Sequence, residues 1–367
     1  MTVEALGAGP WRGKRVLVTG HTGFKGAWLC LWLTRLGARV TGFSLAPEER
    51  PNLFELAGIQ RQVQSCIGDL RDPTQVARVV RQCDPEVVFH LAAQSLVRRS
   101  YAEPIETFAI NVMGTVNLLE ALRQTGAVRA VVVVTSDKCY ENRSLDRGYV
   151  EDDPLGGHDP YSASKGCAEI VAASYRRSFF HQPGNAAVAS ARAGNVIGGG
   201  DWSTDRLLPD LVRAFEAGLP APIRNPAAIR PWQHVLEPLA GYVELATSLQ
   251  DDYSRQYARG WNFGPEAEAT ATVGAVADLA AAAWGDGARW TTDGGVHPHE
   301  AGVLMLDASA ARTSLGWTPC LPLERAVADT IDWHRAMASG ADAAGLCHRQ
   351  IDAYIERRTA ATHGTHP

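Results

Sequence analysis

A tyrosine and a lysine four residues apart are the side chains of this sequence best suited to acid–base chemistry. Tyr161 and Lys165 stand in the segment YSASK, and on a helix this spacing places both side chains on one face. An ammonium group beside a phenol favours the phenolate, so it lowers the tyrosine pKa from its usual value of about 10. Tyr161 is therefore predicted to act as a base near neutral pH. The alternative is an ordinary exposed Tyr–Lys pair.

Three polar residues, Ser136, Asp137 and Lys138, directly follow the most apolar strand predicted in the chain, AVVVVT at 130–135. Doubly wound sheets bind their ligands at such strand ends. A hydroxyl of Thr135 or Ser136 could hydrogen-bond a reacting oxygen there. Asp137 and Lys138 could supply a proton donor and a proton acceptor for an elimination. The alternative is a polar loop that only closes the strand.

A glycine-rich turn after the first predicted strand is typical of dinucleotide binding. The segment TGHTGFKG (19–26) places glycines at every third position. Glycines permit a tight turn, close approach of the backbone to a diphosphate and close packing of helix on strand. The following helix presents free N–H groups to the anion. The alternative is a purely structural turn. The predicted cofactor contacts here are Gly20, Thr22, Gly23, Phe24 and Gly26.

The adenosine half of the predicted site is less well defined. The second strand ends in GFSL (42–45) and lacks the acidic residue that usually holds the ribose hydroxyls. The local chemistry therefore does not discriminate NAD from NADP. Asp69 and Leu70 follow the third strand and are predicted to frame the adenine; the alternative for Asp69 is a helix cap ahead of Asp72. After the fourth strand, small residues would let the backbone pass the cofactor at Leu91, Ala92 and Ala93.

Polar and basic residues elsewhere are candidates for substrate binding. Gln94 follows the fourth strand, and Asn195 follows the sixth, where its amide could hold a sugar or phosphate oxygen or simply form a turn. Arginine suits a diphosphate because its planar guanidinium donates two hydrogen bonds at once. We expect two of the three arginines Arg206, Arg224 and Arg230 to contact one, although any single one could be an exposed surface residue. No metal-ligand spacing is present.

The elements that must position these residues alternate along the first half of the chain. Continuous apolar strands separated by helices indicate a parallel sheet covered on both faces, and right-handed crossovers make it doubly wound. The predicted fold class is therefore α/β, with a Rossmann-type sheet. The predicted strands are 15–19, 38–43, 63–67, 86–91, 130–135 and 187–193, and the predicted helices are 24–36, about 104–125 and about 160–180.

The pattern changes after about residue 195. Prolines at 209, 220, 222, 226, 231 and 238 break the chain into short pieces, and GWNFGP (260–265) is predicted to return to the sheet. We predict a dinucleotide-binding domain over 12–195 with a return segment 233–265, and a smaller, interleaved substrate-binding lobe over 196–232 and 266–340. Within 266–340, short strands and helices are expected at 271–284, 307–315 and 321–338. The polar segment 359–367 is predicted to be a frayed tail.

Composition argues against several classes of protein. The net charge of −5 offers no excess of positive charge for nucleic-acid phosphates. No apolar run reaches the length of a membrane span, and the first residues lack the order of a secretory signal, so we expect a cytoplasmic protein. The seven scattered cysteines are expected to be reduced thiols. Only four of the 35 basic residues are lysines, and three of these, Lys25, Lys138 and Lys165, lie in the motifs above.

Six segments together resemble the extended short-chain dehydrogenase/reductases that modify nucleotide sugars, and within that group the CDP-glucose 4,6-dehydratases. The resemblance covers about residues 12–340. The glycine turn and the Tyr-xxx-Lys pair are shared across the superfamily, whereas GHTGFKG, TSDK and RPWQHV are more specific. The segments are TGHTGFKG (19–26), HLAAQSLVRRSY (90–101), TSDKCYEN (135–142), DPYSASKG (159–166), ARAGNVIGGGDW (191–202) and RNPAAIRPWQHV (224–235).

This resemblance implies a lyase that uses NAD and acts on CDP-glucose. Tyr161, assisted by Ser136 and Lys165, would remove the proton of the sugar 4-hydroxyl while the C4 hydride passes to NAD. The 4-ketone acidifies the C5 hydrogen, water leaves across C5 and C6 with Asp137 as the acid, and hydride returns to C6. In related dTDP-glucose dehydratases a glutamate is the proposed C5 base, and this chain has Lys138 there. Lys138 could serve only if its pKa were depressed, so the C5 base stays open.

The resemblance also implies a homodimer formed through the helices at 104–125 and 160–180; alternatively, these helices simply cover the sheet. The product would enter deoxysugar and lipopolysaccharide O-antigen biosynthesis. Two other functions stay open. A nucleotide-sugar 4-epimerase needs no acid at position 137, and a non-catalytic NAD(P)-sensing regulator need not keep Tyr161 and Lys165 together. Another nucleoside diphosphoglucose is also a possible substrate.

Overall fold

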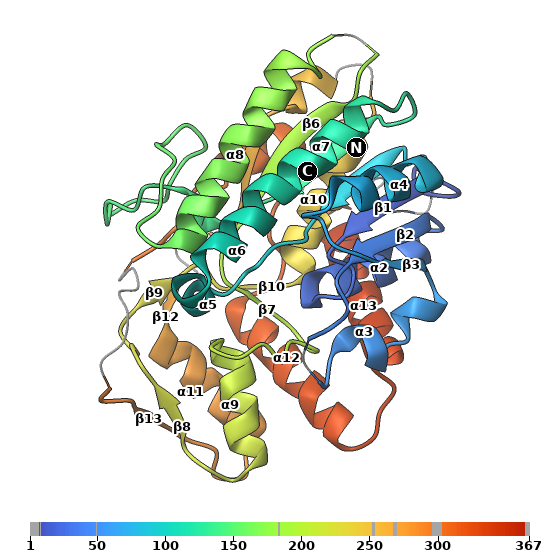
Figure 1. The fold of residues 1–367 in the computed structure, drawn as a ribbon. Coiled ribbons are helices and arrows are strands. Elements are labelled where there is room, and N and C mark those ends of the chain that lie inside the picture. Colours follow the sequence, from blue (N-terminus) through green and yellow to red (C-terminus); the bar gives the residue numbers. More distant parts are fainter. Residues whose placement is uncertain are drawn as a thin grey trace.

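A seven-stranded parallel sheet forms the centre of the computed structural model (Figure 1), which describes residues 7, 9–48, 50–182, 184–251, 254–266, 270–295 and 303–363. The strand order is β11-β6-β5-β4-β1-β2-β3, so the order reverses at β1 and β4, where doubly wound sheets bind ligands. The predicted α/β fold is confirmed. The strands are β1 (Arg15–Thr19), β2 (Arg39–Ser44), β3 (Gln64–Ile67), β4 (Val87–His90), β5 (Ala130–Val134), β6 (Ala187–Ala193) and β11 (Gly260–Phe263).

Each face of this sheet has its own hydrophobic core, because successive side chains of a strand point to opposite faces. Val16 and Val18 of β1 belong to one buried cluster, and Leu17 belongs to another. The helices that contribute to the first cluster include α2 (Phe24–Arg35), α10 (Leu236–Ser248) and α13 (Ala343–His363). Those of the second are α4 (Pro73–Cys83), α7 (Gly114–Arg123) and α8 (Pro160–Ser178).

A third apolar cluster holds together the part of the chain drawn below the sheet in Figure 1. It is built from α9 (Leu207–Glu216), α11 (Val273–Trp284) and α12 (Leu323–Ala338). The predicted boundaries between the two lobes stay a prediction. Small two-stranded sheets pair β8 (Ala221–Ile223) with β13 (Trp290–Thr292), β9 (Ile229–Arg230) with β12 (Ala271–Thr272), and β7 (Val196–Ile197) with β10 (Gln233–His234). The short helices are α3 (Leu53–Leu56), α5 (Val97–Ala102) and α6 (Pro104–Phe108).

Two prolines that were expected to break the chain lie inside helices instead. Pro209 and Pro238 fall in the first turns of α9 and α10, where backbone N–H groups have no partner within the helix and proline is tolerated. The helix predicted for 104–125 is divided into α6, a π-helical turn at Ala109–Met113 and α7.

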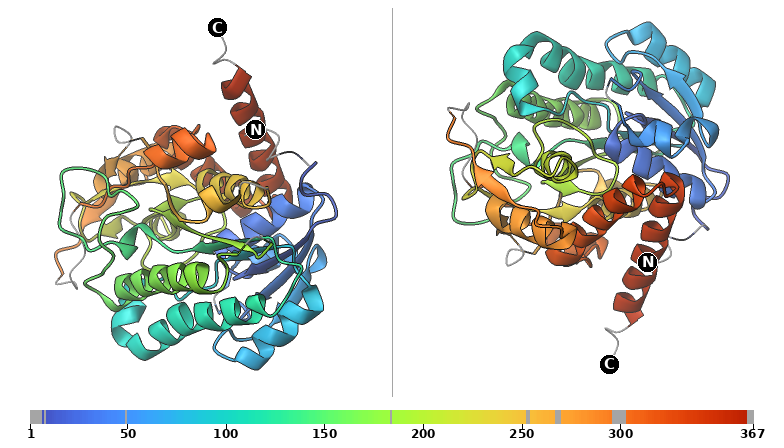
Figure 2. Two further views of the ribbon diagram at one scale, coloured as in Figure 1. Left: turned by 90° about the horizontal axis from the view of Figure 1, so that it is seen from above. Right: turned by 90° about the horizontal axis from the view of Figure 1, so that it is seen from below.

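The predicted frayed tail is also wrong for residues 359–363, which belong to α13. Two buried contacts hold this helix against α10: the Tyr354 hydroxyl donates to Glu237 over 2.7 Å, and Arg358 pairs with Glu244. Figure 2 shows the end of α13 extending away from the rest of the protein. Residues 364–367 lie outside the described part of the chain.

Candidate active site

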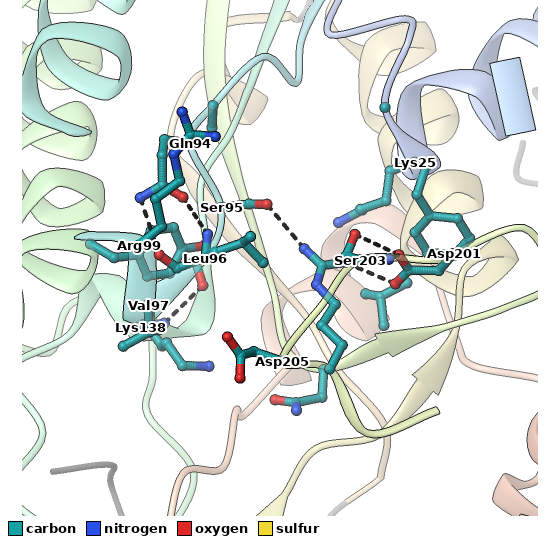
Figure 3. A pocket seen from close by; sticks show the side chains of 18 of the residues that line it. Lys25, Gln94, Ser95, Leu96, Val97, Arg99, Lys138, Asp201, Ser203 and Asp205 are labelled. Atoms are coloured by element: carbon teal, nitrogen blue, oxygen red, sulfur yellow. Dashed lines mark hydrogen bonds and ion pairs between the residues drawn. The ribbon is translucent and has the colours of Figure 1, made fainter. Parts of the chain in front are cut away.

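Every site residue predicted from the sequence lines one cavity of about 760 Å³. Its walls come from the turns that follow β1, β4, β5 and β6 at the carboxyl edge of the sheet, and from segments between β7 and β9. Figure 3 shows Lys25 and Lys138 on opposite sides of this space. The topology therefore gathers motifs that are spread over more than 200 residues of sequence into one place.

The glycine turn after β1 fits the diphosphate of a dinucleotide. Gly20 has a φ of +77°, and a Cβ there would lie 2.7 Å from the Ala92 nitrogen. A Cβ at Gly26 would lie 2.0 Å from the Gly20 carbonyl oxygen. Gly23 precedes the first turn of α2, and no side chain in the described part of the chain caps this helix end. The turn thus leaves room and unpaired N–H groups for an anion.

The residues predicted for the adenosine half lie on the same cavity. Asp69 is paired with Arg71 over 2.6 Å, and the hydrogen bonds from Arg71 lower the pKa of its carboxyl. The helix cap considered for Asp69 is supplied by Asp72, whose carboxylate accepts the N–H groups of Thr74 at 2.8 Å and Gln75 at 3.3 Å. Asp69 therefore does not cap this helix; it lines the cavity with its carboxylate bonded to Arg71.

The Tyr161–Lys165 pair lies at the start of α8. Asp159 caps this helix by accepting the Ser162 N–H over 2.9 Å, and both members of the pair are buried. The Lys165 ammonium donates to the Val134 carbonyl over 3.3 Å, while Tyr161 shares a hydrogen bond with Ser136. The Ser136 hydroxyl thus lies beside the phenol, and Lys165 is bonded to the last residue of β5.

Burial controls the charge of both groups. It raises the pKa of Tyr161 to about 12, against the hydrogen bond with Ser136, which lowers it. Burial also lowers the pKa of Lys165 to about 8. The expected depression of the Tyr161 pKa by Lys165 is therefore not found: removing the phenolate from water outweighs the favourable interactions around it.

Asp137 lies beside this pair, in a 3-10 turn formed by Asp137–Cys139. Its Oδ1 accepts a hydrogen bond from Ser136 Oγ over 2.8 Å and is 3.8 Å from Lys138 Nζ. Its Oδ2 is buried and has no hydrogen-bond partner within the described residues. The negative charge of Asp137 acts on Tyr161 and raises its pKa. Asp137 thus keeps one buried carboxyl oxygen without a partner among the described residues, and its charge is close enough to act on the phenol.

The arginines predicted for the substrate, Arg206, Arg224 and Arg230, all line the cavity. Arg206 donates to Asp201 and to Ser95, each over 3.0 Å. Arg224 donates to Asp205 over 2.9 Å, and Arg98 of α5 donates to the same Asp205 oxygen over 3.0 Å. Asp205, labelled in Figure 3, therefore holds together two guanidinium groups from different parts of the fold.

The remaining substrate candidates differ in what they offer. Asn195 has a buried Oδ1 with no hydrogen-bond partner in the described residues, so it can accept a bond from a ligand. Gln94 donates both amide hydrogens within the protein, to the Leu96 carbonyl at 3.1 Å and to Thr107 at 2.9 Å. Gln94 therefore shapes the loop and presents no spare donor. Arg230 is buried and lines the cavity.

Sequence reasoning gave Lys25 no role, yet this half-buried residue lines the cavity (Figure 3). Its Nζ donates to the Tyr242 hydroxyl over 3.1 Å. Burial, followed by the positive charges of Lys165 and Arg206, lowers its pKa to about 7. The scarcity of lysine was the signal that could have identified it, because three of the four lysines line this one cavity.

Within the described part of the chain, no group of three or more His, Cys, Asp or Glu side chains could hold a metal ion. A search of the described helices finds none that could cross a membrane. All seven cysteines are free thiols.

Comparison with known proteins assigns the family. A model of the family described as GDP-mannose 4,6 dehydratase matches residues 17–330. The chain belongs to this family. It is 51% identical over 354 residues to CDP-glucose 4,6-dehydratase of Salmonella typhimurium strain LT2, a match that covers 95% of this chain and 98% of that protein.

Solved structures of nucleotide-sugar enzymes share the dehydratase fold. MoeE5 in complex with UDP-glucuronic acid and NAD is 27% identical, with a TM-score of 0.74 over 89% of this chain and 100% of that one. The UDP-glucose 4-epimerase of Thermus thermophilus, in complex with NAD, is 25% identical, with a TM-score of 0.75 over 87% and 98% of the two chains. The scaffold therefore serves more than one reaction, and the site residues must distinguish them.

Proposed function

We propose that this protein is a lyase that converts CDP-glucose to CDP-4-keto-6-deoxyglucose and water with NAD as cofactor. The observation that carries the proposal is the buried carboxyl of Asp137, which lies beside Tyr161 and has one oxygen without a partner among the described residues. An epimerase has no use for an acid there, whereas a dehydratase must protonate a departing hydroxyl. The 51% identity to a CDP-glucose 4,6-dehydratase supports the substrate.

NAD would be held by the glycine turn from Gly20 to Gly26 and would accept hydride from C4 and return it to C6. The protein groups move the protons. Tyr161, hydrogen-bonded to Ser136, takes the proton of the 4-hydroxyl with the assistance of Lys165, which lies one helical turn away on α8. Asp137 then protonates the departing 6-hydroxyl. Burial of this site excludes water and strengthens these interactions.

The C5 proton requires a separate base, and Lys138 is the candidate. Its ammonium lies 3.8 Å from Asp137. If the two groups close to hydrogen-bond distance, transfer of one proton from the ammonium to the carboxylate leaves an amine that takes the C5 proton and a carboxylic acid that protonates the departing hydroxyl. On the nucleotide side, two of the three arginines Arg206, Arg224 and Arg230 bind the diphosphate, and Asn195 accepts a hydrogen bond from a hydroxyl of the sugar. These assignments rest on the position of each side chain on the cavity and on its hydrogen-bonding capacity.

We also propose that the enzyme is a cytoplasmic homodimer whose product enters deoxysugar and O-antigen biosynthesis. Three large apolar side chains on or beside the 104–125 and 160–180 helices are exposed, which suits a contact with a second copy. They are Ile105, Met113 and Ile170, with exposed fractions of 85%, 52% and 57%.

A panel of nucleoside diphosphoglucoses tests the function. Purified protein and NAD are incubated in D2O with the CDP-, dTDP-, GDP-, UDP- and ADP-linked sugars, and NMR follows the products. Only CDP-glucose should give a 4-keto-6-deoxy sugar, with deuterium at C5. A panel without any 4-keto product would reject the dehydratase, and a preference for another nucleotide would reject the substrate assignment.

A nucleotide-sugar 4-epimerase is the second candidate, because Tyr161, Lys165 and Ser136 could perform C4 oxidation alone and the Thermus epimerase shares the fold. The Asp137→Asn variant separates the two. A dehydratase loses product formation in this variant, whereas an epimerase continues to interconvert its sugars.

A further inference from the structure

Glu169 is a buried acid that the proposed reaction does not use. It lies one helical turn beyond Lys165 on α8 and is 3% exposed. Tyr161, Lys165 and Glu169 are spaced by four residues and therefore share one face of the helix. Burial of a carboxylate is costly unless it is paired and hydrogen-bonded, so the contacts of Glu169 indicate what it holds in place.

Both carboxylate oxygens of Glu169 are satisfied by strands of the sheet. Oε1 accepts a hydrogen bond from Thr135 Oγ1 over 2.5 Å. Oε2 accepts from Ser190 Oγ over 2.6 Å and from Arg192 Nη2 over 2.8 Å. Glu169 thus joins α8 to β6 and to Thr135, the residue that follows β5.

Lys165 and Glu169 form hydrogen bonds with two consecutive residues at the point where β5 ends. The Lys165 ammonium donates to the Val134 carbonyl over 3.3 Å, and Glu169 accepts from the next residue, Thr135. Ser136 and Asp137 follow immediately. The Thr135 hydroxyl, which the sequence suggested for a reacting oxygen, therefore donates to Glu169 instead.

We propose that Glu169 is a positioning residue for the Tyr161–Lys165 pair: its carboxylate keeps Lys165 in the ammonium form and fixes the end of β5, so that Ser136 and Asp137 face the phenol. This role rests on the proposed dehydratase function and deepens it. Glu169 acts through Lys165 and Thr135 and does not itself contact the sugar.

Of the acidic groups that face Lys165, Glu169 is the one that carries a negative charge. Cys139 also faces the ammonium, but burial raises the pKa of this thiol well above its usual value, so the thiol is neutral. Glu169 is ionised, because Arg192 and the hydroxyl donors outweigh its burial and lower its pKa. The titratable or charged groups facing Lys165 are Lys25 of α2, His90 of β4, Cys139, and Glu169 of α8; Arg176 of α8 and Arg192 of β6 face Glu169.

The four lysines of this chain permit a direct measurement. Full-length protein labelled with ¹³C at the lysine ε-carbon gives four side-chain signals, and the Lys165→Arg variant identifies the relevant one. Burial lowers the pKa of Lys165 to about 8, so its ammonium is present below that pH and is lost as the pH rises. In Glu169→Gln the titration midpoint should fall by about one unit or more, and the alkaline limb of the pH–activity profile should move with it.

A matched control is Glu237→Gln, which removes another buried carboxylate, bonded to Tyr354 and the Cys320 and Leu321 amides. This control variant should not change the midpoint of the Lys165 titration. An unchanged Lys165 midpoint in folded Glu169→Gln would overturn the proposal. This titration needs no turnover, so it remains decisive even if the protein proves not to be a dehydratase.

Unfolding of Glu169→Gln is foreseeable, because Arg192 would be left as a buried unpaired charge. The double variant Glu169→Gln/Arg192→Met removes both charges and should still lower the Lys165 midpoint, since Lys165 faces the glutamate. Glu169→Asp keeps the negative charge, but its shorter side chain does not reach Thr135 as well. Because the end of β5 is then less well fixed, kcat should fall about tenfold or more, with little change in KM. A double variant with the wild-type Lys165 midpoint would contradict the proposal.

Discussion

At the scale of single residues, the proposed chemistry depends on how burial sets the charges of a few side chains. Burial alone makes Tyr161 a poor base, with a pKa of about 12. It also brings Lys165 and Lys25 to pKa values of about 8 and 7, so the number of positive charges in the cavity changes near neutral pH. Small changes in the surroundings of these groups therefore have large effects on the reaction.

Replacement of Tyr161 by phenylalanine removes the proposed base and keeps the ring. We expect product formation to fall by about 10²- to 10⁴-fold, the usual contribution of a positioned acid–base group, with folding unaffected. Initial rates and a thermal unfolding curve measure both. Tyr101→Phe is the control, since Tyr101 is exposed and does not line the cavity. A Tyr161→Phe enzyme with near wild-type turnover would assign the base to another group.

The site residues that could be predicted from the sequence are those whose functional partners lie nearby in the chain, at a spacing typical of a motif. Tyr161 with Lys165 and the glycine turn are of this kind. Lys25 was missed because its contact, Tyr242, is 217 residues away, and Asp205 because it joins Arg98, 107 residues away. Only the fold determines such contacts.

At the scale of elements, the turn between β1 and α2 carries the cofactor prediction. In Gly26→Ala the new Cβ would lie 2.0 Å from the Gly20 carbonyl oxygen, so the turn must open. We expect a loss of NAD binding of about tenfold or more, measured by calorimetry. Gly126→Ala is the matched control, because a Cβ there meets nothing within 4 Å. Unaltered NAD affinity in folded Gly26→Ala would show that the diphosphate does not bind at this turn.

Strands were predicted better than helices, and the reason is physical. β1 and β6 agree residue for residue with the prediction, because buried parallel strands are continuous apolar runs with sharp ends. Helices α9 and α10 were missed because their early prolines were interpreted as breaks. The end of α13 was missed because its polar residues are held by Glu237 and Glu244, contacts that its own sequence does not reveal.

At the scale of the whole molecule, the exposed apolar side chains near α6 and on α8 predict a dimer. Ile170→Glu places a charge where a second copy is expected to pack, and it should convert the dimer to a monomer in light scattering coupled to size exclusion. Leu219→Glu is the control. Leu219 is similarly exposed, at 61%, but it follows α9 and does not belong to the helices of the expected contact. The prediction that this surface forms the dimer would be contradicted if the wild-type protein is already monomeric, or if the Ile170→Glu variant is still a dimer.

The path of one hydrogen atom tests the proposed reaction most directly. CDP-glucose carrying deuterium at C4 is incubated with the protein and NAD in ordinary water, and the product is examined by NMR and mass spectrometry. The proposed function predicts that the deuterium is found at C6 of the 4-keto-6-deoxy sugar, while C5 carries hydrogen from the solvent. Deuterium retained at C4 of an intact or epimerised hexose would contradict it.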